Sequence, residues 1–154
     1  MSRRRASTHK ILPADPVYQS KLVCLIVNNV MKEGKKSLAS KIVYKAMSQI
    51  GEKTRQDPAT LLNKAVNHVK PDFIVKARRV GGSTHQTPVK IDERQSEAIA
   101  VRWILASCRK RGGKSMVSNL TAELLEASNR KGNAVRKREE MDRMAAANRV
   151  HQRD

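Results

Sequence analysis

Clusters of cationic side chains are the groups of this sequence whose types and spacing could bind a ligand. One cluster consists of Lys76, Arg78 and Arg79, which precede the paired glycines of V-K-A-R-R-V-G-G-S-T-H-Q-T-P, residues 75–88. Lysine and arginine carry full positive charge and donate several hydrogen bonds, so they suit phosphate oxygens. The spacing predicts an arm that binds a polyanion. The alternative is a solvated hairpin whose edge lysines prevent aggregation.

A longer cluster lies between residues 102 and 114, which contain no acid. Its members are Arg102, Arg109, Lys110, Arg111 and Lys114. Cations at the end of a helix are favoured by the helix dipole, but five charges exceed what that interaction needs, and we favour phosphate binding here. Trp103 adjoins Arg102. A lone tryptophan is more often a core residue than a platform for a base, and its neighbours decide this only weakly.

Two smaller clusters complete the set. Lys35 and Lys36 follow the expected end of the first helix, where the helix dipole and a bound phosphate could both hold them. Arg3, Arg4 and Lys10 lie in an N-terminal stretch without hydrophobic periodicity. We expect that stretch to be disordered alone and to order on a polyanion.

The charge balance points to a polyanionic partner. Lysine and arginine number 32 against 14 acids, which gives a formal charge of +18. A membrane surface is the competing anion, but no apolar run approaches the roughly 20 residues that span a bilayer. No basic helix carries a strong aromatic face either. Nucleic acid is therefore the expected partner, and no membrane contact or homo-oligomer is expected.

Catalytic and metal-binding patterns are not found in the sequence. Gly112-Gly113-Lys114-Ser115 has the tail of a phosphate-binding loop, but the earlier glycine that such a loop needs is absent. The four histidines show no metal-ligand spacing. Cys24 and Cys108 are expected to be buried free thiols. We therefore expect no enzyme activity, no metal and no cofactor.

Hydrophobic periodicity predicts a mainly α fold with six helices. They begin at Asp15-Pro16, Ser37, Asp57-Pro58, Asp92 with Gln95 as a capping box, Ser115 and Asn133. The first is expected to end near Glu33 and the fifth at Gly132. Leu38 belongs to the apolar pattern of the second helix, and Tyr44 near that face is interpreted as a packing residue rather than a base-stacking one.

A two-stranded β-hairpin is expected between the third and fourth helices, over about residues 72–91. Gly81-Gly82 lies between two short runs of strand-forming residues, with a loop of about four to six residues. Pro88 cannot donate to a ladder and marks an edge strand, so the arm is expected to protrude from the body. The chain is expected to divide into a basic extension over residues 1–14 and one helical nucleic-acid-binding domain over residues 15–154.

The nucleic acid itself is not fixed by these patterns. Readers of single strands depend on several aromatic platforms, whereas this chain has few aromatic residues. Recognition of folded RNA or of duplex DNA fits better. The second candidate is a DNA-binding protein in which the helices form a helix-turn-helix-like unit and the hairpin enters a groove. A basic enzyme acting on nucleic acid lacks the carboxylates or metal ligands it would need.

Several segments resemble the small-subunit ribosomal protein seven family of bacteria and organelles. They are Asp15-Pro16-Val17-Tyr18, Gly34-Lys35-Lys36-Ser37, the hairpin sequence of residues 75–88, Ile99-Ala100-Val101-Arg102-Trp103-Ile104, Arg109-Lys110-Arg111, and Ala134-Val135-Arg136-Lys137-Arg138-Glu139-Glu140. They cover nearly the whole chain in the family's order. Lys53-Thr54, Asp57-Pro58 and the S-T-H-Q of residues 83–86 look most like plastid members. The tail after Asn148 departs from the aromatic-rich tail that is common in the family.

The resemblance implies a structural protein that binds small-subunit ribosomal RNA directly and nucleates assembly of the subunit head. It also implies contact with small-subunit ribosomal protein eleven and a place near exit-site transfer RNA and messenger RNA. The expected location is the chloroplast stroma, with the bacterial cytoplasm as the alternative. The RNA contacts implied by matching positions are Arg3, Arg4, Lys10, Lys35, Lys36, Lys76, Arg78, Arg79, Arg102, Trp103, Arg109, Lys110, Arg111 and Lys114.

Overall fold

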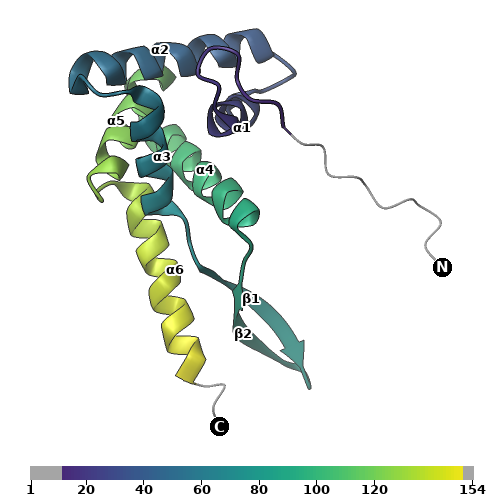
Figure 1. The fold of residues 1–154 in the computed structure, drawn as a ribbon. Helices are drawn as coiled ribbons and strands as arrows, with labels where there is room; N and C mark the ends of the chain where they lie inside the picture. The colour runs from purple at the N-terminus through teal and green to yellow at the C-terminus, as the bar shows by residue number, and fades with distance from the viewer. Residues whose placement is uncertain (1–11, 151–154) are drawn as a thin grey trace, which may run out of the picture.

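The computed structural model describes residues 12–150, which form six helices and one antiparallel hairpin (Figure 1). The elements in chain order are α1 (Lys21–Val30), α2 (Lys36–Thr54), α3 (Pro58–Val69), β1 (Phe73–Val80), β2 (Ser83–Lys90), α4 (Glu93–Lys110), α5 (Met116–Ser128) and α6 (Asn133–Val150). The predicted six helices with a hairpin between the third and fourth are confirmed. Most of the predicted basic extension, and the last four residues, lie outside the described part.

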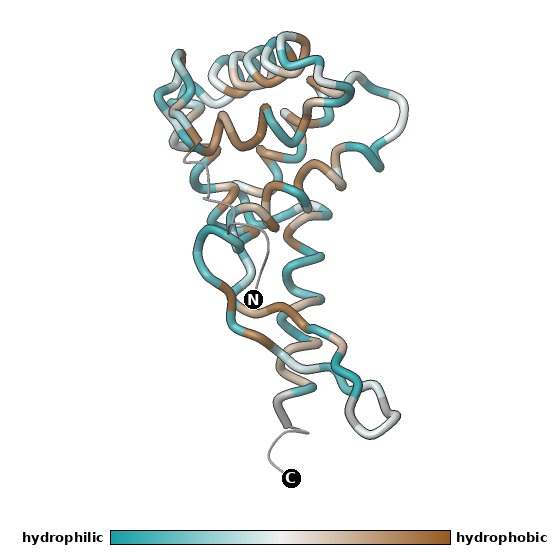
Figure 2. The backbone as a smooth tube through the Cα atoms, turned by 90° about the vertical axis from the view of Figure 1, so that its right-hand side faces the viewer, coloured by the Kyte–Doolittle hydropathy of each residue, from teal (hydrophilic) through white to brown (hydrophobic). Residues whose placement is uncertain are grey.

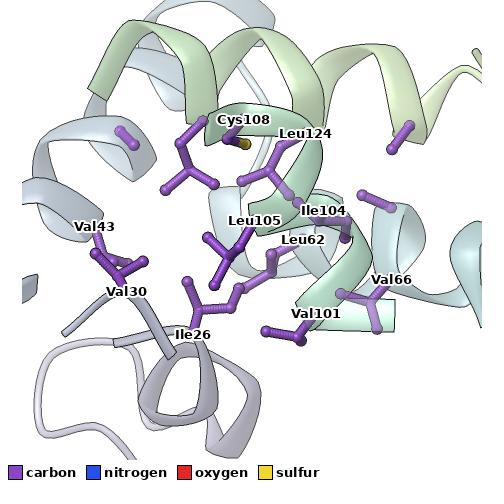
Figure 3. Close-up of a cluster of buried hydrophobic side chains, with 14 of the residues drawn as sticks. Ile26, Val30, Val43, Leu62, Val66, Val101, Ile104, Leu105, Cys108 and Leu124 are labelled. Atoms are coloured by element: carbon purple, nitrogen blue, oxygen red, sulfur yellow. The ribbon is translucent and has the colours of Figure 1, made fainter. Parts of the chain in front are cut away.

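Helices α1 to α5 enclose one hydrophobic core. Ile26, Leu62, Ile104 and Leu124, from four of these helices, are almost fully buried and point toward one another (Figure 3). The apolar residues of each helix recur at steps of three and four, which places them on one face. The core therefore fixes how the ends of the helices, where most of the basic clusters lie, are placed relative to one another.

The hairpin extends from this body, and α6 runs alongside it (Figure 1). Ile74 pairs with Val89 near the base of the hairpin, where both side chains are half-buried. Figure 2 shows that the hydrophobic residues of the hairpin gather near this base and that its outer part is more hydrophilic. The side-chain amide of Asn148 on α6 lies 3.4 Å from Gln86 Oε1 on β2. The arm protrudes as predicted, with α6 beside it.

The hairpin turn is tighter than the loop of about four to six residues predicted from the sequence. Val80 pairs with Ser83, so that Gly81 and Gly82 alone form the loop. Their φ angles are +57° and +91°. Positive φ at both central residues is what a type I′ turn requires, and glycine adopts it without steric cost. The strands can therefore pair up to the glycines themselves.

The predicted bounds of the first and fifth helices are wrong. Helix α1 ends at Val30, before Glu33. It begins only at Lys21, because the Asp15 carboxylate accepts hydrogen bonds from the backbone N–H groups of Val17 and Tyr18 and closes a turn before the helix. Helix α4 begins directly after Asp92, as predicted, but the Asp92 side chain makes no capping hydrogen bond. Helix α5 ends at Ser128 rather than at Gly132. By contrast, the Asp57 and Ser115 side chains cap α3 and α5 as predicted.

Asp15 also fastens this N-terminal turn to α2. Asp15 is buried, with 6% of the residue exposed. Its carboxylate accepts a third hydrogen bond, of 2.7 Å, from the hydroxyl of Tyr44. That hydrogen bond is the main cause that raises the pKa of Tyr44 to about 12. The ring of Tyr44 lies 6.0 Å from that of Tyr18. Tyr44 is thus a packing residue, as interpreted from the sequence.

Replacement of Asp15 by alanine is expected to lower the free energy of unfolding by about 2–3 kcal/mol, because three part-buried donors would lose a charged acceptor. Urea denaturation followed by circular dichroism measures this change. Asp92→Ala is the control, since Asp92 is exposed and its side chain forms no cap. We expect that control to cost less than about 1 kcal/mol. Equal losses for the two variants would contradict the assigned role of Asp15.

Candidate nucleic-acid interface

The hairpin holds the first basic cluster in an exposed position. Lys76, Arg78 and Arg79 are all exposed on β1 and none of them forms an ion pair with a described residue. Successive side chains of a strand point to opposite faces, so Lys76 and Arg78 share one face and Arg79 lies on the other. Their partners across the ladder are Thr87, His85 and Thr84. The charges are therefore available to an external anion on both faces.

Lys35 and Lys36 lie at the start of α2 rather than at the end of α1. Lys35 is the N-cap residue and Lys36 is the first residue of the helix. A helix N-terminus carries partial positive charge, so the dipole disfavours these cations. Lys35 Nζ lies 2.7 Å from a carboxylate oxygen of Glu33, but both side chains are largely exposed and such pairs contribute little. The helix-dipole explanation of this cluster is wrong, and an external anion explains it better.

The end of α4 brings a third cluster close to the second. Arg109 is exposed, and its guanidinium donates a 3.1 Å hydrogen bond to the carbonyl oxygen of Asn29. Arg109 and Lys35 line the same hollow, of about 370 Å³. Leu38, which the sequence pattern placed on the buried face of α2, is 54% exposed and also lines it. Cations of two clusters that are far apart in sequence therefore meet at one hollow, whose lining is otherwise mostly apolar.

Arg111 is bound within the protein and differs from its neighbours in this respect. Its guanidinium donates to Glu123 Oε2 at 2.9 and 2.6 Å and to Glu126 Oε1 at 3.0 Å. The hydrogen bonds to Glu126 and then to Glu123 raise its pKa further above the usual range. The absence of acids between residues 102 and 114 concealed this pairing, because both carboxylates come from α5. Arg111 therefore orders the turn after α4.

Glu123 joins three elements. Its side chain is fully buried, and Oε1 accepts a 3.0 Å hydrogen bond from the backbone N–H of Ala134 in the first turn of α6. Gly132 lies beside the carboxylates of Glu123 and Glu126. Its φ of +98° favours glycine, and a Cβ added there would lie 3.1 Å from Glu126 Oε2 and 3.3 Å from Glu123 Oε1. The Glu123 carboxylate thus holds the turn after α4 and the start of α6 in one arrangement.

Trp103 is half-buried and packs against the core, while it also lines an open hollow between α4 and α6. Three cations line the same hollow, namely Lys110, Arg136 and Lys137. Arg136 and Lys137 were not among the predicted contacts, although they belong to the matching segment at the start of the sixth helix. In the sequence they belong to a run of three bases followed by two acids, residues 136–140, which gave no sign of a site. Only the packing of α6 against α4 reveals their relation to Trp103.

The remaining predicted positions fall into two groups. Arg102 and Lys114 are exposed, in the middle of α4 and in the turn before α5. Arg3, Arg4 and Lys10 lie outside the described residues. Within residues 12–150 no group of three histidine, cysteine or acidic side chains could hold a metal ion. None of the helices in that part of the chain has the length and apolar character to cross a membrane.

The two cysteines do not form a nucleophilic site. Cys24 and Cys108 are free and buried, as predicted. Burial, with a smaller contribution from nearby Glu123, raises the pKa of the Cys108 thiol to about 12. A thiol that stays protonated is a poor nucleophile, so Cys108 acts as a core residue.

Comparison with known proteins identifies the relatives of this chain. The family model described as ribosomal protein S7p/S5e matches residues 1–149. The small ribosomal subunit protein uS7c of Pleurastrum terricola is 52% identical over 153 residues, which are 99% of each chain.

Removal of the buried carboxylate in Glu123→Ala is expected to destabilise the fold by about 3–5 kcal/mol, because the charge of Arg111 would lose its fully buried partner. Chemical denaturation measures the loss. Glu139→Ala on the exposed side of α6 is the control and should change stability by less than about 0.5 kcal/mol. A Glu123 variant as stable as that control would show that the ion pair does not hold these elements together.

Proposed function

Since this chain belongs to the ribosomal protein S7p/S5e family, we propose that its exposed basic clusters bind small-subunit ribosomal RNA directly and nucleate assembly of the subunit head. The protein is a structural constituent of the small ribosomal subunit and not an enzyme. Membership of a ribosomal family also removes the support for the DNA-binding alternative.

The main support is that cations from separate elements are exposed without ion-pair partners in the described part of the chain. The proposed contacts there are Lys35, Lys36, Lys76, Arg78, Arg79, Arg102, Trp103, Arg109, Lys110 and Lys114. Lys35 is the exception, since it has a weak exposed pair with Glu33. Arg3, Arg4 and Lys10 are proposed as further contacts outside the described residues. Arg111 contributes by ordering the turn that carries Lys114.

The mechanism is electrostatic and depends on a rigid body. Each cation that meets a phosphate releases condensed counterions from the RNA, which makes binding favourable and dependent on salt. The helical core fixes the relative positions of the clusters before binding, so little conformational entropy is lost when they meet several phosphates at once. The hairpin adds an arm, stiffened by its ladder, that carries cations on both faces.

Neutralising the hairpin cluster tests this mechanism. Arg78→Gln with Arg79→Gln is expected to weaken binding to a transcript of the ribosomal RNA head domain, and to lower the slope of log affinity against log salt by about 1–2. Filter binding over a salt series measures both quantities. The matched control is Lys53→Gln with Lys64→Gln, two exposed cations of α2 and α3. Affinity and slope equal to those of the unaltered chain would refute the assignment of the hairpin.

We further propose that the protein contacts small-subunit ribosomal protein eleven, near the exit-site transfer RNA and the messenger RNA, in chloroplast ribosomes. The support is the resemblance to plastid members at residues 53–58 and 83–86, together with the similarity to the uS7c protein. The bacterial cytoplasm is the alternative location.

Chemical cross-linking of assembled chloroplast small subunits, read by mass spectrometry, tests these neighbours. We expect cross-links between exposed lysines of this protein and protein eleven, because direct contact brings the two surfaces within reach of a short linker. Cross-links confined to other proteins would contradict the proposed contact. Absence of the protein from purified chloroplast small subunits would contradict the location.

A further inference from the structure

The hollow between α4 and α6 combines an aromatic wall with several cations. It has a volume of about 490 Å³ and is lined by Trp103, Ala106, Ser107, Lys110, Asn133, Arg136, Lys137 and Glu140. This volume falls within the roughly 300–1,000 Å³ typical of sites for small organic ligands, and it exceeds what a lone phosphate needs. The hollow therefore has room for a flat organic group as well as an anion.

The cations of the hollow are available to an anion. Lys110, Arg136 and Lys137 are exposed, and none forms an ion pair with a described residue. The first turn of α6 contains no acid, although acids are what a helix N-terminus favours, and it contains Arg136 instead. An external anion would compensate for this unfavourable placement.

The walls of the hollow are held before any ligand arrives. Trp103 is half-buried against the core, and the start of α6 is fixed by the hydrogen bond from Ala134 N–H to Glu123 Oε1. That bond also satisfies the Ala134 N–H, so this backbone donor is not available to the anion. Glu140 is the one acid of the lining and is outnumbered three to one. A carboxylate only accepts hydrogen bonds, which suits a base that offers an amino group.

We propose that this hollow holds one unpaired nucleotide of the bound ribosomal RNA, with its base against the indole of Trp103 and its phosphate on Lys110, Arg136 and Lys137. The inference rests on the proposed function and adds a single point of base contact to an interface that otherwise binds phosphates. An indole stacks on any base, while the cations fix where the backbone enters. Arg136 and Lys137 then join the set of RNA-binding residues.

Tryptophan fluorescence reports on this hollow alone, because Trp103 is the single tryptophan of the chain. Titration with a transcript of the ribosomal RNA head domain is expected to quench the emission and to protect it from acrylamide, at the same RNA concentrations that saturate filter binding. Tight binding with unchanged emission and unchanged acrylamide access would overturn the subsite and leave the proposed function standing. Failure of the unaltered chain to bind the transcript would overturn both.

Variants separate stacking from charge. Trp103→Leu is expected to lower affinity for the transcript roughly ten-fold or more, the effect of losing one base–aromatic stack, and Trp103→Phe to restore most of the loss. Because Trp103 also packs on the core, circular dichroism must show that both variants are folded.

The charge variant, Arg136→Gln with Lys137→Gln, avoids the core altogether. It is expected to weaken binding and to shift the fluorescence titration to higher RNA concentration, whereas the control Lys53→Gln with Lys64→Gln leaves the titration in place. Equal affinities for the leucine and phenylalanine variants, or a charge variant that behaves as its control, would contradict the subsite.

Discussion

The buried carboxylate of Glu123 is the interaction on which the arrangement of the basic surface depends. It accepts hydrogen bonds from the Arg111 guanidinium and from the first turn of α6, and so joins the end of α4, α5 and α6. Removing two opposite charges from water is costly, and the geometry must be good for the pair to be tolerated. Its position explains why Arg111 is paired within the protein, although the chain is rich in cations that could bind an external anion. The Glu123 contacts thereby fix the elements that carry the neighbouring exposed cations.

Several exposed cations, unlike Arg111, lie where their charge is electrostatically unfavourable in the isolated protein. Lys36 opens α2 and Arg136 lies in the first turn of α6, where the helix dipole repels positive charge. The formal charge of +18 adds repulsion across the whole molecule. Binding of ribosomal RNA phosphates at these positions, as proposed, would relieve both costs. The helical core supplies the stability that keeps these charges in place until RNA binds, and the hairpin with α6 beside it carries part of the charge away from the body.

Local sequence signals predicted the helices and the hairpin well, since periodicity and capping residues such as Asp57 and Ser115 act over a few residues. They failed where a side chain has a distant partner. Asp15 looked like a helix cap but binds Tyr44 and closes a turn, and the two acids that neutralise Arg111 come from the next helix. The hollow beside Trp103 could not be predicted for the same reason, because it forms only where α4 and α6 pack together.

Competition binding tests the central claim most directly. The purified chain would be titrated onto a transcript of the ribosomal RNA head domain over a salt series, with duplex DNA and an unrelated folded RNA as competitors. If the basic clusters are arranged to match this RNA, binding to the transcript should be tight and neither competitor should displace it. The salt slope should then correspond to several released counterions. Equal displacement by either competitor would show that net charge alone drives binding, and would contradict an interface built for ribosomal RNA.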